Sequence, residues 1–153
     1  SLVDAEKLRK ALLSELKKLA EVIIIDVPTG DCAWYATNEE VIMVTQPDFP
    51  SILDLKKLMK IANVHGVIVN RMHNDAIDLS FANIQELISK SILGVVPAEM
   101  AMREALRHGY SIIEFHPELK ASNVLKQIAA KLMNLEYESP VKMSLLMKLG
   151  LVS

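Results

Sequence analysis

The amino-acid sequence predicts an α/β fold in which helices cover both faces of a mainly parallel sheet. Short runs rich in valine and isoleucine alternate with longer helix-like segments, which is typical of βα units. These runs are apolar at nearly every position, as in parallel strands that are buried on both faces. With 153 residues, of which 51% are hydrophobic, the chain is long enough for one two-sided core. We therefore expect a three-layer α/β/α arrangement.

The order of the elements follows from the positions of these runs. The expected strands lie near residues 22–26, 41–45, 66–70 and 92–96. The expected helices span about 4–20, 52–63, 81–89, 100–108 and 121–135. The helix-like segments that separate the later strands have a suitable length for right-handed crossovers. Residues 1–135 are expected to form the α/β domain, followed by a short tail over 136–153.

Composition and charge exclude several classes of function. The net charge of −2, with Lys and Glu interleaved, gives no basic field for nucleic-acid binding. The single cysteine, Cys32, cannot form an intramolecular disulfide and is compatible with a reducing compartment. No run reaches the roughly 18 apolar residues that a membrane span requires. A cytoplasmic location is the expectation from these observations.

Polar or turn-forming residues follow each expected strand. They are Asp26 with Pro28 and Gly30, then Thr45 with Gln46 and Pro47, then Asn70 with Arg71, and finally Pro97 with Glu99. In open parallel sheets, ligands bind beyond the carboxyl ends of the strands, so these residues form a candidate site. An acid at the end of a buried strand is typical of a metal or phosphate site, although Asp26 also suits a simple turn.

Four segments in order resemble the later part of the MinD/ParA family of deviant Walker A P-loop ATPases. Residues 22–30, VIIIDVPTG, resemble the Walker B and switch II strand, and 41–54, VIMVTQPDFPSILD, resemble the strand and loop that come next. Residues 66–71, GVIVNR, resemble the adenine-side strand, and 92–105, ILGVVPAEMAMREA, resemble the last loop and helix start. The resemblance covers nearly the whole chain and implies an incomplete P-loop fold.

The resemblance implies a role for each residue of the candidate site. Asp26 would act in catalysis by holding Mg²⁺ through water, and Pro28 and Gly30 would place a backbone N–H near the γ-phosphate. Asn70 would read the adenine edge, and Arg71 would cover the base as a planar cation. Pro97 and Glu99 would close the other side of the base or ribose. ATP or ADP with Mg²⁺ is the cofactor that a complete form would bind.

The phosphate-binding part of the family's pattern is missing from this sequence. No G-x-x-x-x-G-K-[ST] motif occurs, and the five glycines are isolated. The chain alone is therefore not expected to hydrolyse ATP. In the family, the missing first strand separates the strands expected at 22–26 and 41–45, so its removal leaves a slot of about 10 Å. Three outcomes satisfy the backbone hydrogen bonds: another chain fills the slot, the two strands pair directly, or the sequence is a fragment.

The expected function is that of a MinD/ParA-like ATPase portion, in division-site placement or DNA partition. A homodimer, or a partner that supplies the missing strand, is the expected assembly. The alternative is a degenerate relative that serves as a dimerisation or partner-binding module, and a receiver-like or flavodoxin-like domain is a third reading. Residues 141–153 form either a basic amphipathic helix for peripheral membrane contact or a packed segment.

Overall fold

The computed structural model describes residues 2–28, 40–73 and 75–138. The chain divides into two compact units, Ser1–Cys32 and Ala33–Ser153, which are described separately below. The first unit contains helix α1, Leu2–Leu16. This helix begins two residues before the predicted start and ends four residues before the predicted end. A turn follows it, in which the Ala20 N–H donates to the Leu16 carbonyl at 3.1 Å.

The strand predicted at 22–26 is wrong. These residues adopt neither helix nor strand. Three of their apolar side chains are exposed, Val22 at 49%, Ile24 at 91% and Ile25 at 40%, and Ile23 is half-buried. A strand needs a neighbour that takes up its backbone hydrogen bonds, and residues 22–26 are not among the three strands of the described sheet. Asp26 therefore does not stand at the carboxyl end of a strand, and it is exposed.

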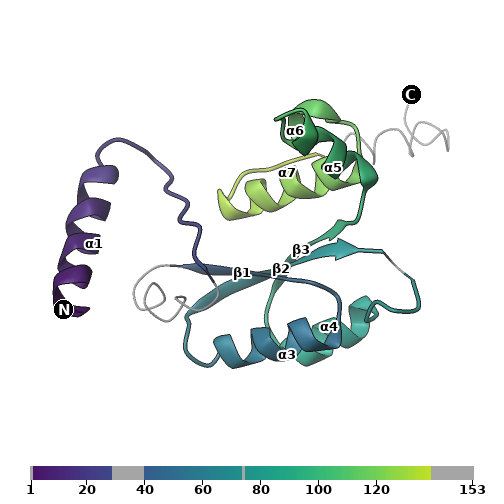
Figure 1. The fold of residues 1–153 in the computed structure, drawn as a ribbon, viewed down its shortest axis with the longest axis horizontal. Helices are drawn as coiled ribbons and strands as arrows, with labels where there is room; N and C mark the ends of the chain where they lie inside the picture. The colour runs from purple at the N-terminus through teal and green to yellow at the C-terminus, as the bar shows by residue number, and fades with distance from the viewer. Residues whose placement is uncertain (1, 29–39, 74, 139–153) are drawn as a thin grey trace. The chain divides into compact units, whose positions relative to one another are not determined.

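The second unit is built around a three-stranded parallel sheet (Figure 1). Its strands are β1, Val41–Thr45, β2, Val64–Met72, and β3, Ile92–Pro97, in the order β1-β2-β3. The three strands predicted for this part of the chain are confirmed. Within the described sheet, β1 is an edge strand that pairs with β2.

Helices α3, Phe49–Leu58, and α4, Phe81–Ile88, cover one face of the sheet (Figure 1). Both begin at side-chain caps, since Asp48 accepts the Ser51 N–H at 2.9 Å and Ser80 accepts the Asn83 N–H at 3.2 Å. Their apolar sides join the sheet in one core cluster: Met43, Ile52, Leu55, Val64, Val67, Val69, Met72, Ile84 and Ile88.

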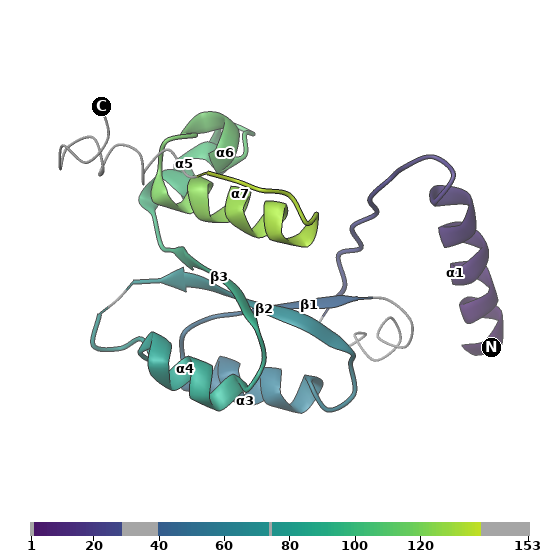
Figure 2. The ribbon, with the colours of Figure 1, turned by 180° about the vertical axis from the view of Figure 1, so that it is seen from behind.

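Three helices lie on the opposite face, as the reverse view confirms (Figure 2). They are α5, Met100–Arg107, α6, Ile112–Phe115, and α7, Lys120–Leu132. The short α6 was not predicted. It starts at a capping box, in which the Ser111 hydroxyl accepts the Glu114 N–H and the Glu114 carboxylate accepts the Ser111 N–H. This hydrogen bonding lowers the pKa of Glu114.

The absence of a side chain at Gly94 lets α7 approach β3 closely. A Cβ at this position would lie 2.6 Å from both Cγ1 and Cδ1 of Ile128. Ile128 is itself buried, at 4% exposure, in a core cluster with Leu93, Val96 and Ala121. The spacing between α7 and the sheet therefore depends on the pair Gly94 and Ile128.

We predict that Gly94→Ala lowers the free energy of unfolding by about 1–3 kcal/mol, the usual range for overpacking a core. Ile128→Val removes the Cδ1 atom, so the double variant should lose less stability than the sum of the two single variants. Urea unfolding of the three variants measures this coupling. Strictly additive losses would show that the contact does not set the spacing.

Candidate functional site

The carboxyl ends of the three parallel strands lie at one edge of the sheet, and backbone bonds tie their loops together. The Leu79 N–H donates to the Pro47 carbonyl at 2.7 Å, which links the residues after β1 to the start of α4. The Ala98 N–H donates to the Met72 carbonyl at 2.9 Å, which links the loop after β3 to the end of β2. These two bonds fix the positions of the loops at the carboxyl edge.

A bulge at the end of β2 places Asn70 and Arg71 at this edge. Val69 pairs with Val95 and Met72 pairs with Pro97, so three steps along β2 match two steps along β3. Arg71 takes up the extra residue in a left-handed conformation, with φ of 61°. The Asn70 side-chain oxygen accepts the Arg71 N–H at 3.0 Å and stabilises this conformation.

Left-handed backbone in a residue other than glycine is unfavourable, by about 1–2 kcal/mol. Such conformations cluster at ligand sites, where the surrounding structure maintains them. Val69 precedes the bulge and Met72 follows it, and both are buried in the core cluster between the sheet and helices α3 and α4. The core therefore holds the bulge in place, while Asn70 is half-buried and Arg71 is exposed.

The loop after β2 contains a second ordered turn that the sequence did not reveal. The Asp75 carboxylate accepts the N–H groups of Ile77 and Asp78, at 2.9 and 3.2 Å. The Asp78 carboxylate accepts the His73 N–H at 2.5 Å. Both acids thus hold the loop. Throughout the described residues, no group of three or more His, Cys, Asp or Glu side chains could hold a metal ion.

Glu99 makes a contact that differs from its predicted role. Its Oε1 accepts the Ala121 N–H at 3.0 Å, so it caps the start of α7, where the N-cap residue Leu119 has no capping side chain. A carboxylate is favourable there because of the helix dipole. Its Oε2 is buried and has no hydrogen-bond partner in the described part of the chain. Glu99 thereby ties the loop after β3 to α7.

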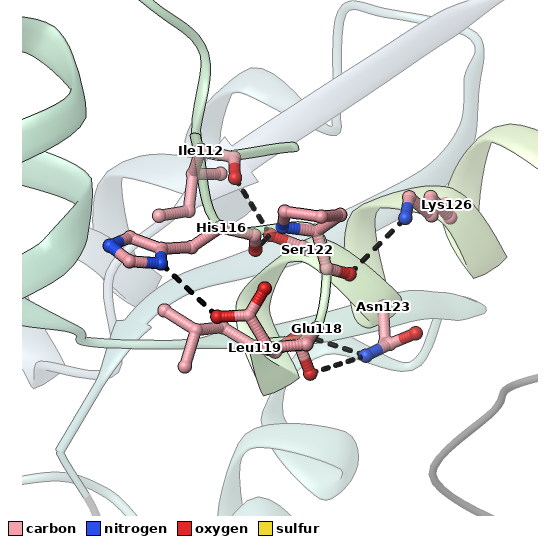
Figure 3. A network of polar contacts seen from close by, with 8 residues as sticks. Ile112, His116, Glu118, Leu119, Ser122, Asn123 and Lys126 are labelled. Carbon is pink, nitrogen blue, oxygen red and sulfur yellow. Dashed lines mark hydrogen bonds and ion pairs between the residues drawn. The ribbon is translucent and has the colours of Figure 1, made fainter. Parts of the chain in front are cut away.

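Buried polar groups fix α7 against the α6 turn (Figure 3). The Ser122 hydroxyl is directed at two carbonyls, Ile112 at 3.1 Å and His116 at 2.6 Å. Ser122 has no exposed surface, so these bonds satisfy its hydroxyl within the core. The position of the cap on α7 is consequently set from both sides, by Glu99 and by the α6 turn.

No protein-family model matches the chain. The chain is 30% identical over 156 aligned positions to an uncharacterised ATP-binding protein of Methanocaldococcus jannaschii, covering 92% of this chain and 59% of the relative. It is 28% identical to the chloroplastic MinD homologue of Arabidopsis thaliana, a septum site-determining protein, covering 86% of this chain and 42% of the relative.

Solved structures agree with these relatives in fold. MinD of Pyrococcus horikoshii in complex with Mg-ADP superposes with a TM-score of 0.56 and 24% identity, over 61% of this chain and 41% of that one. MinD from the MinC:MinD complex of Aquifex aeolicus gives a TM-score of 0.57 and 24% identity, over 65% and 44% of the two chains. The chain is a relative of the MinD/ParA-type ATP-binding proteins. It spans about 59% of the length of its M. jannaschii relative.

The predicted MinD/ParA-like site residues fall into two groups. Asn70, Arg71, Pro97 and Glu99 lie in the second unit at the ends of two paired strands, so the structure brings them to one edge. Asp26 and Pro28 lie in the first unit and are exposed, and Gly30 lies outside the described residues. Among the described residues, neither group contains three or more His, Cys, Asp or Glu side chains that could hold a metal ion.

The left-handed conformation of Arg71 gives a direct test of the bulge. Glycine adopts positive φ without steric cost, so Arg71→Gly should keep the stability of the protein or raise it by up to about 1 kcal/mol. Arg103→Gly, at an exposed position inside α5, is the control and should cost about 1 kcal/mol. Urea unfolding compares them. A larger loss for Arg71→Gly than for Arg103→Gly would contradict the strain argument.

Proposed function

We propose that the chain is the adenine-side part of a MinD/ParA-type ATPase that serves in division-site placement or DNA partition. The observation that carries this proposal is the Asn70–Arg71 bulge, which the pairing of Met72 with Pro97 holds beside the loop after β3. A strained bulge at the carboxyl edge of a parallel sheet is where a nucleotide base is expected.

Each residue of this edge would contribute a different contact to the base. The Asn70 amide carries a donor and an acceptor, which match the edge of adenine, and its oxygen also braces the Arg71 N–H. The Arg71 guanidinium is a planar cation that stacks on a base. Pro97 supplies the opposite apolar wall. Glu99 would act as a positioning residue, since its carboxylate fixes the loop to α7.

Phosphate chemistry would need residues that this chain does not contain. Mg²⁺ supplies charge neutralisation at the phosphates when it is bound, and Asp26 would hold it through water. Pro28 and Gly30 would bring a backbone N–H toward the γ-phosphate. The chain lacks a Gly-rich loop with its lysine, so hydrolysis would depend on a polypeptide part that carries them.

Dimerisation and partner binding belong to the same proposal. A solved MinD of Aquifex aeolicus is in complex with MinC, which supports a protein partner for the complete protein. We also propose that ATP favours a homodimer.

Membrane contact is a separate part of the proposal. We propose that residues 141–153, which lie outside the described residues, contact a membrane peripherally. In the described part of the chain, no helix has the length and apolar character to cross a bilayer.

The open edge of β1 favours a second candidate, a non-catalytic dimerisation or partner-binding module. In the described sheet, β1 pairs on one side only, and the unused side offers free backbone groups. The intact mass of the natural protein separates the two candidates. A mass near 17.0 kDa favours the module, and a mass larger by about 10 kDa, roughly the size of a P-loop element, favours the ATPase.

We predict that Mg·ATP shows no saturable binding to this chain below millimolar concentration, because the phosphate loop contributes most of the contacts. Isothermal titration measures this directly. When a segment with a P-loop is fused in front of the chain, micromolar binding should appear. In that fusion, Asn70→Ala should weaken ATP binding at least tenfold, whereas Asn83→Ala, at an exposed position of α4, should not.

In the same fusion, Asp26→Ala should abolish ATP hydrolysis while leaving binding of the base largely intact, because Mg²⁺ is no longer positioned. Release of phosphate at saturating ATP measures the loss, and Asp26→Asn tests whether the charge is required. Wild-type turnover in Asp26→Ala would mean that Asp26 serves only as a turn residue.

A further inference from the structure

Glu99 stands at the start of one helix and caps another. It is the N-cap residue of α5, with the extended backbone that this position requires (φ −127°, ψ 132°). Its side chain nevertheless makes no capping bond to α5, a helix that lies wholly within the described residues. Its Oε1 instead accepts the Ala121 N–H at 3.0 Å, at the start of α7 and 22 residues further along the chain. One carboxylate therefore lies beside the starts of two helices.

Both helices lack another acid that could serve as their cap. The first turns of α5 and α7 contain no acidic residue, and the N-cap residue of α7, Leu119, makes no side-chain capping bond. A carboxylate is favourable at either start, because the first N–H groups of a helix have no partner within the helix and the helix dipole is positive there. In the present position, Oε2 of Glu99 is buried without a hydrogen-bond partner among the described residues. This unsatisfied oxygen reduces the advantage of the cap on α7 over a cap on α5.

The first turn of α7 also holds the residues that follow the helix. Asn123 is buried, at 3% exposure, and its amide nitrogen donates to the carbonyls of Glu118 and Leu119 at 3.1 and 2.9 Å (Figure 3). Its side-chain oxygen accepts the Tyr137 hydroxyl at 3.1 Å. Ala121 and Asn123 belong to the same turn. The cap from Glu99 and the contact of Tyr137 therefore stabilise one and the same turn.

We propose that Glu99 is a two-position cap that couples the loop after β3 to the residues that follow α7. In the position that this structure shows, the carboxylate caps α7 and Tyr137 bonds to the first turn of that helix. In the other position, the carboxylate turns back onto the first turn of α5, and the start of α7 loosens and releases Tyr137. Coupling between two sites requires an element with two arrangements that both sites bias, and a shared cap is such an element.

A ligand at the loop after β3 would act on this cap. The Ala98 N–H donates to the Met72 carbonyl at 2.9 Å, which places the loop beside the bulge of β2. A base bound against Pro97 would make different contacts in the two positions of Glu99 and would shift the distribution between them. By linkage, the Tyr137 contact would change the affinity for the base by the same factor. This step rests on the proposed function, whereas the two positions themselves require no nucleotide.

Amide hydrogen exchange, measured by NMR on the chain without nucleotide, tests the two positions of Glu99. Glu99→Asp shortens the side chain by one methylene, so its carboxylate no longer reaches Ala121, but aspartate is a preferred N-cap residue and should hold α5. We expect the Ala121 N–H to exchange about fivefold faster, the change that the loss of a typical cap produces. The Ala101 N–H, in the first turn of α5, should exchange more slowly than in the wild-type chain.

The control for this variant is Glu99→Ala, which removes the carboxylate from both helices and should speed exchange at Ala121 and at Ala101. All rates are compared as ratios to that of the Val67 N–H, which is bonded to the Ser91 carbonyl at 2.9 Å in the sheet, so a uniform loss of stability cancels. Equal exchange of Ala101 in the two variants would overturn the proposal. Because no nucleotide is present, that result would leave the proposed function standing.

Tyr137→Phe tests the coupling, because it removes only the hydroxyl that bonds to the first turn of α7. The loosened turn should release Glu99 to α5, so the Ala121 N–H should exchange faster and the Ala101 N–H more slowly than in the wild-type chain. Simple fraying of α7 would speed exchange at Ala121 and leave Ala101 unchanged, and this outcome would overturn the proposal. Tyr110→Phe, at a position that is 55% exposed, removes a hydroxyl outside this turn and should change neither rate.

Discussion

A strand inside a parallel sheet must be hydrogen-bonded along both edges and packed against other elements on both faces, and this constraint governs the structure. The middle strand, β2, satisfies it: β1 and β3 are hydrogen-bonded to its two edges. Its residues alternate between two cores: Val67 and Val69 lie between the sheet and helices α3 and α4, and Ile68 lies on the opposite face, toward α7. The helix layers on both faces therefore pack against one shared strand.

The same strand makes the candidate site possible. β2 is longer than either neighbour, and its last residues carry the bulge into the carboxyl edge of the sheet. Because Val69 and Met72 are buried on either side of the bulge, the core compensates for the unfavourable backbone of Arg71. Packing energy in the interior thus maintains a conformation at the edge that the local sequence does not favour.

Most of the second unit could be predicted from the sequence, because strands 41–45, 66–70 and 92–96 are short apolar runs whose neighbours lie within the same unit. The run at 22–26 looks the same in sequence, but its state depends on a neighbour that the pattern does not specify. The signal for α6 was present, since Ser111 and Glu114 have capping-box spacing, but four residues are too few to show a helical period.

The details of the site were less accessible to sequence reasoning. Asn70, Arg71 and Pro97 were correctly placed at strand ends. The positive φ of Arg71 arises from the unequal steps of β2 and β3, which is a property of two strands and not of one segment. Likewise, the capping contact of Glu99 reaches Ala121, 22 residues away in the chain, and such a contact has no local signature.

The end of α7 sets the direction of the residues that follow the helix. Asn134 is left-handed, with φ of 53°, and the Leu135 N–H donates to the Ala130 carbonyl at 2.8 Å, so the chain reverses after the helix. The Tyr137 hydroxyl then donates to the Asn123 side-chain oxygen at 3.1 Å, near the beginning of the same helix. The described part of the chain, which ends at residue 138, therefore finishes near the first turns of α7 and not near the last turn of the helix.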